Sequence, residues 1–326
     1  MKTKSKNRKL RIALGICIPL IIIIAAALAV VMKYGPTFGF YFVPPSAETY
    51  GKNALSTIDK NGIFAGNDEW KSTYNECLKM IENAKSYDDT YDAIKKALSV
   101  GGGKHSMLMT KSESQNTTES YDEVLPTVSL DGDIAIIKLP DFLGTAEAGQ
   151  KYAKIAEDFI HENRDKINGV VLDLRSNTGG DMGPMATAVS SLLPDGELVY
   201  YHYRSYDVPV TLKNGVVSNA GTGGKSLYPE EKLNVPVAIL TDDMTASSGE
   251  ALTLCFRGLE NTKTFGAPTA GYTSVNMLYN MYDGAQMYLT VAFDKARTGE
   301  IFKETPIEPD VATDSPLEAA IEWLRG

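Results

Sequence analysis

The chain has 326 residues, of which 43% are hydrophobic, and this excludes a disordered or fibrous protein because such a chain can bury a large core. The formal net charge is -9, and removal of the six cations of the first eleven residues leaves -15 on the rest, which excludes nucleic acid as an expected partner. The three cysteines, Cys17, Cys77 and Cys255, and the three histidines lack the spacing of a disulfide framework or a zinc site, so we expect no metal and no cofactor.

The first segment indicates a membrane anchor. Six basic residues within 1–11 precede an uncharged apolar run over 12–32, which is about the 20 residues that a helix needs to cross a bilayer. Basic residues before such a run favour a cytoplasmic N-terminus. We therefore expect a cytoplasmic tail, one transmembrane helix and an extracytoplasmic remainder of a single-pass cell-membrane protein. The alternative is a cleaved signal peptide, for which Ala27-Leu28-Ala29 offers a site.

A helical subdomain is expected next. After a linker at 33–46, apolar residues at helical spacing predict two or three helices between Ala47 and Leu98. The glycines at 101–103 end the last of them. We assign 47–106 to this subdomain, and the polar segment from Thr110 to Glu123 has the composition of an exposed loop.

From Ile134 onward, β-rich runs alternate with helical ones. The continuous apolar strands suit a sheet covered on both faces, which predicts an α/β layered fold. Two later runs flank Asp283-Gly284 as a hairpin, and Ser315 caps a closing helix that ends near Leu324. The expected strands are 134–139, 169–174 and 235–241, the helices are 149–163, 184–193 and 248–259, and the hairpin strands are 276–282 and 285–293.

Ser247 follows one of these buried strands and precedes a helix. A serine at such a junction presents its hydroxyl at the helix N-terminus, where free N–H groups can stabilise an oxyanion, and this is the setting of a nucleophile. The alternative is that Ser247 and Ser248 only cap the helix.

Two further segments carry chemistry. The strand that ends at Leu174 leads into Gly179-Gly180, where the backbone can approach a substrate and offer N–H donors, although a simple loop is the alternative. His105 lies in a short polar connection, as an accessible catalytic histidine would. His161 and His202 are expected to be surface or packing residues.

These segments resemble peptidase family S41, which comprises the tail-specific (C-terminal processing) proteases and the tricorn core. The resemblance runs from about Tyr50 to the C-terminus and rests on five strings in the family's order. It implies a crotonase/Clp-like layered sheet-and-helix core, assigned to 107–326. The strings are Gly-Gly-Lys-His-Ser at 102–106, Asp-Leu-Arg-Ser-Asn-Thr-Gly-Gly at 173–180, Thr-Ala-Ser-Ser-Gly-Glu at 245–250, Gly-Ala-Pro-Thr-Ala-Gly at 266–271 and Glu-Pro-Asp at 308–310.

The resemblance also implies roles for single residues. Ser247 matches the nucleophile, and the backbone N–H groups of Ser248 and of Gly179 or Gly180 match the oxyanion donors. The tail-specific branch has a catalytic lysine where this chain has Tyr272, and a tyrosine with a pKa of ~10 is a poor base at neutral pH.

The tricorn-like branch instead implies a histidine base supported by an acid. His105 matches the histidine, and Glu304 is our choice for the acid, with Glu308 as its rival. Between residues 107 and 133 there is no room for the PDZ domain that many relatives carry.

We therefore expect a membrane-anchored serine peptidase that hydrolyses extracytoplasmic peptides or proteins through an acyl-enzyme on Ser247. The alternative is a catalytically weak or inactive S41-like binding or scaffold protein. The substrate, the choice between endoproteolytic and tail-specific cleavage, and the oligomeric state stay open.

Overall fold

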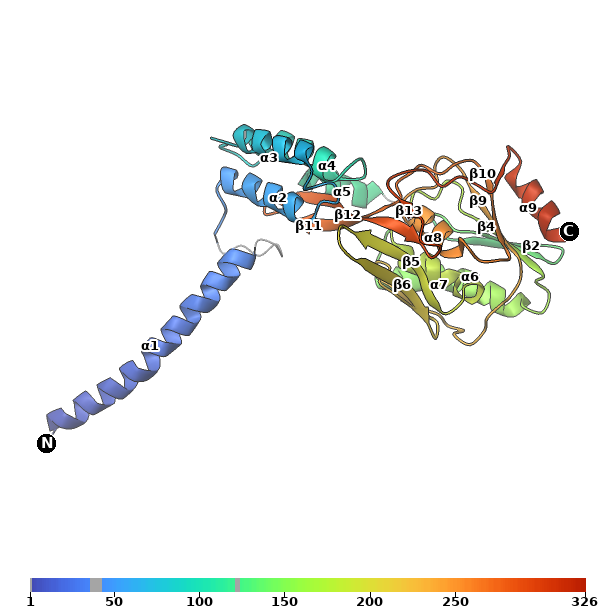
Figure 1. Ribbon diagram of the computed structural model, residues 1–326. Helices are drawn as coiled ribbons and strands as arrows, with labels where there is room; N and C mark the ends of the chain where they lie inside the picture. Colours follow the sequence, from blue (N-terminus) through green and yellow to red (C-terminus); the bar gives the residue numbers. More distant parts are fainter. Residues whose placement is uncertain (1, 36–42, 121–123) are drawn as a thin grey trace. The chain divides into compact units, whose positions relative to one another are not determined.

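The structure is a computed structural model that describes residues 2–35, 43–120 and 124–326. The chain forms two compact units, which are described separately (Figure 1). Unit 1 comprises Met1–Gly101, Met107–Gln115 and Leu278–Leu289, and unit 2 comprises Gly102–Ser106, Asn116–Met277 and Thr290–Gly326. Of the segments predicted above, part of the linker (36–42) and the end of the polar loop (121–123) lie outside the described residues.

The N-terminal segment is helical. Helix α1 (Lys2–Tyr34) includes the run at 12–32 that we expected to cross a membrane. Across the described ranges, no helix combines the length and the apolar character that a membrane span requires. The predicted transmembrane helix therefore has no support from the structure.

Three helices build the rest of the N-terminal part of unit 1: α2 (Ala47–Asn61), α3 (Asp68–Met80) and α4 (Tyr91–Gly101), with a 3₁₀ turn η2 (Asp88–Thr90) before α4. This confirms the helices predicted between Ala47 and Leu98. Asn67 caps α3 by accepting the Trp70 N–H at 2.7 Å. Trp70 is fully buried, and a Cβ on Gly101 would lie 2.7 Å from its ring, so a glycine ends α4 where the helices pack closely.

The polar segment that begins at Thr110 is not the loop that its composition predicted. Strand β1 (Met107–Met109) is followed by helix α5 (Lys111–Ser120). Thr110 and Glu113 form a reciprocal cap: the Thr110 N–H donates to Glu113 Oε2 at 2.7 Å, and the Glu113 N–H donates to Thr110 Oγ1 at 3.3 Å. This capping box supplies the helix start that the absence of apolar residues concealed.

The core of unit 2 is a six-stranded sheet in the order β14-β10-β9-β4-β3-β2. Only the β2–β3 pair is antiparallel, and the other neighbours are parallel. The strands predicted around Ile134, Gly169 and Val237 are confirmed. The strands are β2 (Thr127–Asp131), β3 (Ile134–Lys138), β4 (Gly169–Asp173), β9 (Val237–Thr241), β10 (Thr262–Gly266) and β14 (Val311–Ala312).

Both faces of this sheet are covered, as the apolar strands predicted. Val171 and Leu240 belong to a cluster that helix α9 (Pro316–Arg325) covers, and Figure 1 shows α9 along β10, β9 and β4. Leu172 and Ile239 point to the opposite face, into the main core. Helices α6 (Ala146–Asn163), α7 (Met182–Ala188) and α8 (Ser248–Phe256), with the 3₁₀ turn η3 (Ser190–Leu192), contribute to that core. The predicted helix at 184–193 is thus split.

An antiparallel sheet completes unit 2, and most of it was not predicted. Strand β12 (Gln286–Ala296) pairs with β5, β13 and β11 (Ser274–Asn280), so the predicted hairpin is confirmed. In unit 1, the first residues of β12 pair with β1. The remaining strands are β5 (Gly196–Tyr203), β6 (Asp207–Lys213), β7 (Val216–Ser218), β8 (Gly224–Lys225) and β13 (Ile301–Phe302).

Asp294 is an unusual residue near the end of β12. Its side chain is buried, and neither carboxylate oxygen has a hydrogen-bond partner within the described residues. Burial first, and then the proximity of Glu250, raise the pKa of Asp294 well above its ordinary value. The folded protein therefore favours the protonated form of this side chain.

We predict that Asp294→Asn stabilises the protein, and more so at pH 8 than at pH 5. The folded state keeps a proton that the unfolded carboxyl loses above its pKa of ~3.9. Wild-type stability therefore falls as pH rises, by up to about 1.4 kcal/mol per pH unit, until the folded-state pKa is passed. Urea unfolding at both pH values measures the difference, with Asp243→Asn at an exposed position as the control. A gain that is the same at both pH values would contradict the assignment.

Candidate active site

The candidate site lies in unit 2, at the carboxyl ends of three parallel strands. The segment after β4 carries Gly179 and Gly180, the segment after β9 carries Ser247, and the segment after β10 carries Tyr272. Neighbouring parallel strands end at the same edge of a sheet, so these three segments meet there.

Ser247 occupies a strained backbone conformation. Its φ of 51° and ψ of -115° lie in a region that residues with a side chain rarely adopt, and it directly precedes helix α8. The Ser247 N–H donates to Glu250 Oε2 at 2.9 Å. A sharp strand-to-helix turn of this kind exposes a serine hydroxyl, as nucleophile turns do in other hydrolases.

Glu250 fixes the conformation of the Ser247 turn. It is fully buried, and its carboxylate also accepts the Gly271 N–H at 2.8 Å, the Tyr272 N–H at 2.7 Å and the Thr269 hydroxyl. Burial raises the pKa of Glu250, and these donors act against that rise. One side chain thereby fixes the Ser247 turn to the segment that follows β10.

Gly179 and Gly180, the two candidate oxyanion donors of the glycine segment, differ in whether their N–H groups are already hydrogen-bonded. Gly179 is buried, and its N–H donates to Asn177 Oδ1 at 2.9 Å, so this donor is already used. Gly180 is exposed, and its N–H makes no hydrogen bond to any described residue. A Cβ on Gly179 would lie 2.8 Å from Ser247 Cβ and 3.1 Å from Ser248 N, so only glycine permits this close approach.

Hydrogen bonds join the glycine segment to the serine segment. The Ala246 N–H donates to the Asn177 carbonyl at 2.9 Å, and Ser248 Oγ donates to the Gly180 carbonyl at 2.6 Å. Ser248 is the first residue of α8, so its own N–H has no acceptor inside the helix. The N–H groups of Ser248 and Gly180 are the donors that this arrangement leaves for a ligand.

His105 lies in a half-buried position with its ring oriented by Ser274. His105 Nδ1 is 3.0 Å from Ser274 Oγ, and Ser274 Oγ donates to Glu304 Oε1 at 3.3 Å. Glu304 therefore reaches the ring through a serine hydroxyl. Burial lowers the pKa of His105 to about 4, and the nearby Lys104 cation acts in the same direction.

Glu304 also fixes the backbone of the histidine segment. Its carboxylate accepts the N–H of Lys104 at 3.1 Å and of His105 at 3.3 Å, while its own φ is 55°. Glu308, the rival acid, is exposed and makes none of these contacts. Of the two candidates, the structure brings Glu304 to the histidine.

Tyr272 links the serine and histidine parts of the site. Its ring packs edge-on against the His105 ring, with centroids 5.1 Å apart, and its N–H shares Glu250 Oε2 with Ser247. The Lys104 ammonium lies 4.7 Å from the centroid of the same ring. No hydrogen bond joins Ser247 Oγ to the His105 ring in the described part of the chain; such bonds are often long before substrate binds.

The other histidines lie in separate ion-pair clusters. His161 stacks on Tyr228 and contacts Glu231 at 2.8 Å, and His202 contacts Asp207 at 2.6 Å. Their expected surface and packing roles agree with these contacts.

Three site residues were missed in the sequence: Asn177, Glu250 and Ser274. Glu250 stands three residues after Ser247, and this capping-box spacing was a usable signal. Asn177 stands inside the glycine string without a pattern of its own. Ser274 had no sequence signal, because only the fold places it beside His105.

Comparison with known proteins gives one family. Residues 133–313 match the family described as Peptidase family S41. The chain is 37% identical over 318 residues to a nisin-resistance protein of Lactococcus lactis subsp. lactis, covering 97% of this chain and 99% of that protein. It is 27% identical over 195 residues to the carboxy-terminal processing protease CtpA of Bacillus subtilis (strain 168), covering 60% of this chain but 38% of that protein.

Solved structures agree on the fold. A structure described as a lipoprotein from Streptococcus agalactiae has a TM-score of 0.79 at 32% identity, covering 88% of this chain and 98% of that one. The photosystem II D1 C-terminal processing protease has a TM-score of 0.58 at 15% identity, covering 87% of this chain and 98% of that one. The α/β architecture is therefore that of an S41 peptidase.

We predict that the His105 ring titrates near pH 4, well below an ordinary histidine. Burial disfavours the imidazolium, so the neutral ring persists as the pH falls through the ordinary range. NMR of the histidine ring protons as a function of pH measures this, with the signal assigned by its loss in His105→Gln. A midpoint near 6.5 would show that the ring is more solvated than the structure indicates.

Proposed function

The chain belongs to peptidase family S41, a family of serine-type peptidases, and from this premise we propose that it hydrolyses peptide bonds through an acyl-enzyme on Ser247. The observation that carries the assignment is the strained Ser247 turn beside two N–H groups, those of Ser248 and Gly180, that have no acceptor among the described residues. A helix cap alone does not require this conformation, since cap residues have ordinary extended backbones.

In the proposed mechanism, Ser247 Oγ attacks the substrate carbonyl carbon while His105 Nε2 takes the hydroxyl proton. The resulting oxyanion accepts hydrogen bonds from the N–H groups of Ser248 and Gly180, each worth about 3 kcal/mol in the transition state. Collapse breaks the C–N bond, and His105 returns the proton to the leaving amine. A water molecule then attacks the carbonyl carbon of the acyl-enzyme while His105 takes its proton. Collapse breaks the ester bond, and His105 returns the proton to Ser247 Oγ.

The contacts of His105 suit a general base. The Ser274 hydroxyl donates its proton to Glu304 Oε1, so Ser274 Oγ accepts the Nδ1–H of His105. The neutral ring then carries its proton on Nδ1, and Nε2 is the nitrogen that can accept a proton. The low pKa keeps the ring neutral at pH 7. Glu304 supports the histidine through Ser274 and through the backbone, rather than by direct contact with the ring.

The proposal for a substrate is supported by the relative that matches nearly the whole chain. That relative is named a nisin-resistance protein, whereas the match to the processing protease covers 38% of that protein. We therefore propose nisin as the first peptide substrate to test. The net charge of -9 also favours substrates that are not strongly acidic.

We further propose that the N-terminal segment attaches the enzyme to the cell membrane, with the peptidase outside the cytoplasm. The support is the sequence pattern of six cations before the uncharged run at 12–32, and the helices described in the structure add none.

We predict that Ser247→Ala lowers the rate of peptide hydrolysis at least about 10³-fold, because the covalent route is lost. Ser248→Ala should cost about tenfold, since its backbone N–H remains and only the bond to the Gly180 carbonyl disappears. Nisin cleavage followed by mass spectrometry measures both, with circular dichroism as the folding control. A Ser247→Ala protein that cleaves at the wild-type rate would overturn the proposed function.

We predict that His105→Ala removes nearly all activity, whereas Tyr272→Phe retains most of it. The phenylalanine keeps the ring against His105 and loses only the phenol, which a histidine-based mechanism does not use. Steady-state hydrolysis by the two folded variants gives the comparison. Equal and severe losses would mean that His105 is not the only base.

We predict that fractionated cells retain the full-length protein in the membrane. Deletion of residues 1–33 should release it into the soluble fraction. Recovery of the wild type mainly as a soluble form that starts after Ala29 would contradict the anchor and favour a cleaved signal peptide.

A further inference from the structure

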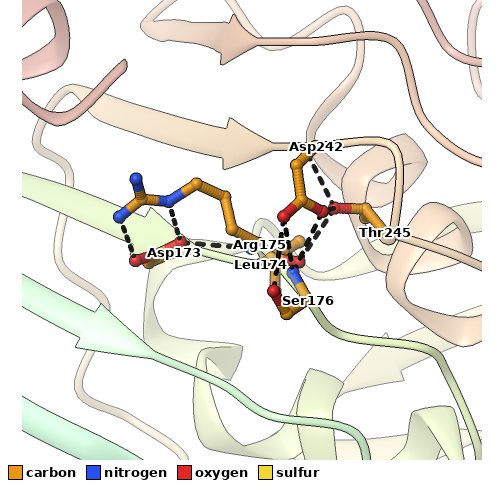
Figure 2. A network of polar contacts seen from close by, with 6 residues as sticks. All are labelled: Asp173, Leu174, Arg175, Ser176, Asp242 and Thr245. Carbon is orange, nitrogen blue, oxygen red and sulfur yellow. Dashed lines mark hydrogen bonds and ion pairs between the residues drawn. The ribbon is translucent and has the colours of Figure 1, made fainter. Parts of the chain in front are cut away.

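The two loops that carry the nucleophile and the oxyanion donor are joined by a polar network at their bases (Figure 2). The first loop, residues 174–180, follows β4, and the second, residues 242–247, lies between β9 and α8. Figure 2 shows Asp242 and Thr245 of the second loop directed at Leu174 and Ser176 of the first.

Asp242 provides the main connection. Both of its carboxylate oxygens lie 3.0 Å from the Ser176 backbone nitrogen, which donates to them. The same carboxylate accepts the Met244 N–H at 3.1 Å, so it also shapes its own turn, and its Oδ1 lies 3.1 Å from Thr245 Oγ. Asp242 therefore fixes the conformation of one loop and captures the backbone of the other.

Thr245 forms the second connection. Its buried hydroxyl lies 2.9 Å from the Leu174 carbonyl and accepts the Asp242 N–H at 3.0 Å. Ser176 has a φ of 62°, a left-handed conformation that costs free energy for a serine. The bonds from Asp242 and Thr245 hold Ser176 itself and Leu174, two residues before it.

Arg175 has a different partner. Its guanidinium forms a two-point pair with Asp173, at 2.8 and 2.7 Å, and Figure 2 shows it directed away from the Asp242 carboxylate. The contacts of Asp242 are to backbone N–H and hydroxyl donors. Its role is thus to orient main chain, which a carboxylate acceptor does well.

Both of the residues that the network holds, Ser176 and Thr245, come shortly before a catalytic group in the sequence. Four residues after Ser176 is Gly180, whose N–H faces the proposed oxyanion position, and two residues after Thr245 is Ser247. Transition-state stabilisation depends on donor positions to within a fraction of an ångström, and a displacement of about 1 Å can cost about 10²-fold in rate.

We propose that Asp242 is a positioning residue that sets the distance between the Gly180 N–H and the Ser247 hydroxyl by fastening the two loops together. The inference rests on the proposed function, because it concerns the same nucleophile and oxyanion donor. Asp242 does not touch substrate; it acts through Ser176 and Thr245.

The test compares Asp242→Ala with Asp242→Asn in the full-length protein. Alanine removes every acceptor, whereas the asparagine oxygen can replace Oδ1 and keep the bonds from the Ser176 and Met244 N–H groups. A fluorophosphonate probe reacts with the nucleophile without a known substrate. We expect D242A to lower the maximal labelling rate of Ser247 about 10- to 100-fold, with the probe's half-saturation constant unchanged within about threefold. D242N should stay within about fivefold of the wild type.

Asp243→Ala is the matched control, since this exposed aspartate adjoins Asp242 and has no part in the network. Amide hydrogen exchange of residues 174–181 gives a readout that does not depend on activity, and we expect it to accelerate in D242A but not in D242N or D243A. Wild-type labelling at Ser247 reports on the proposed function separately. If the wild type is not labelled there, the proposed function fails, and hydrogen exchange still decides whether Asp242 fastens the loops.

Two results would overturn the inference. One is a D242A protein whose maximal labelling rate stays within threefold of the wild type. The other is a 174–181 segment that exchanges at the wild-type rate in D242A. If D242A does not fold, Thr245→Val is the test, because it removes the hydroxyl at nearly constant shape. A labelling rate about tenfold below the wild type then supports the inference, and an unchanged rate overturns it.

Discussion

The parallel pairing of β4, β9 and β10 is the constraint on which the site depends. It ends three strands at one edge of a sheet, so that the segments carrying Gly180, Ser247 and Tyr272 emerge together. The pairing is stabilised by apolar side chains on both faces, which alternate between the main core and the cluster under α9. Loops at such an edge are free to carry strained residues, because the sheet beneath them provides the folding free energy.

Three acidic side chains of the site accept hydrogen bonds from backbone N–H groups, and they hold the main chain in place in this way rather than by pairing with cations. Glu250 accepts N–H groups from the Ser247 turn and from the segment after β10, Glu304 accepts those of Lys104 and His105, and Asp242 accepts that of Ser176. Apart from the bond between Ser247 and Glu250, which lie three residues apart, these bonds join segments that are distant in the sequence. A carboxylate with several N–H donors suits this role because its two oxygens satisfy several donors at once.

The contacts around His105 account for a tyrosine, Tyr272, at the position of the family's lysine. Tyr272 contributes a ring that packs against His105 and an N–H that donates to Glu250. His105, the proposed base, is held on its other side by Ser274 and Glu304. Burial gives the same ring a low pKa, so the unprotonated form that a general base requires is present at neutral pH.

Much of this protein could be predicted from its sequence, because strands and helices leave periodic apolar patterns and Ser247 stands at a readable strand-to-helix boundary. The parallel core strands, the closing helix and the candidates Ser247 and His105 came from such local signals, whereas Glu304 and its grouping with them came from the resemblance to the family. The tertiary structure alone decided that the Gly179 N–H is occupied while that of Gly180 is open, that Ser274 stands between His105 and Glu304, and that α5 is a helix. These facts depend on hydrogen bonds between side chains and distant main chain, whose partners no periodic pattern encodes.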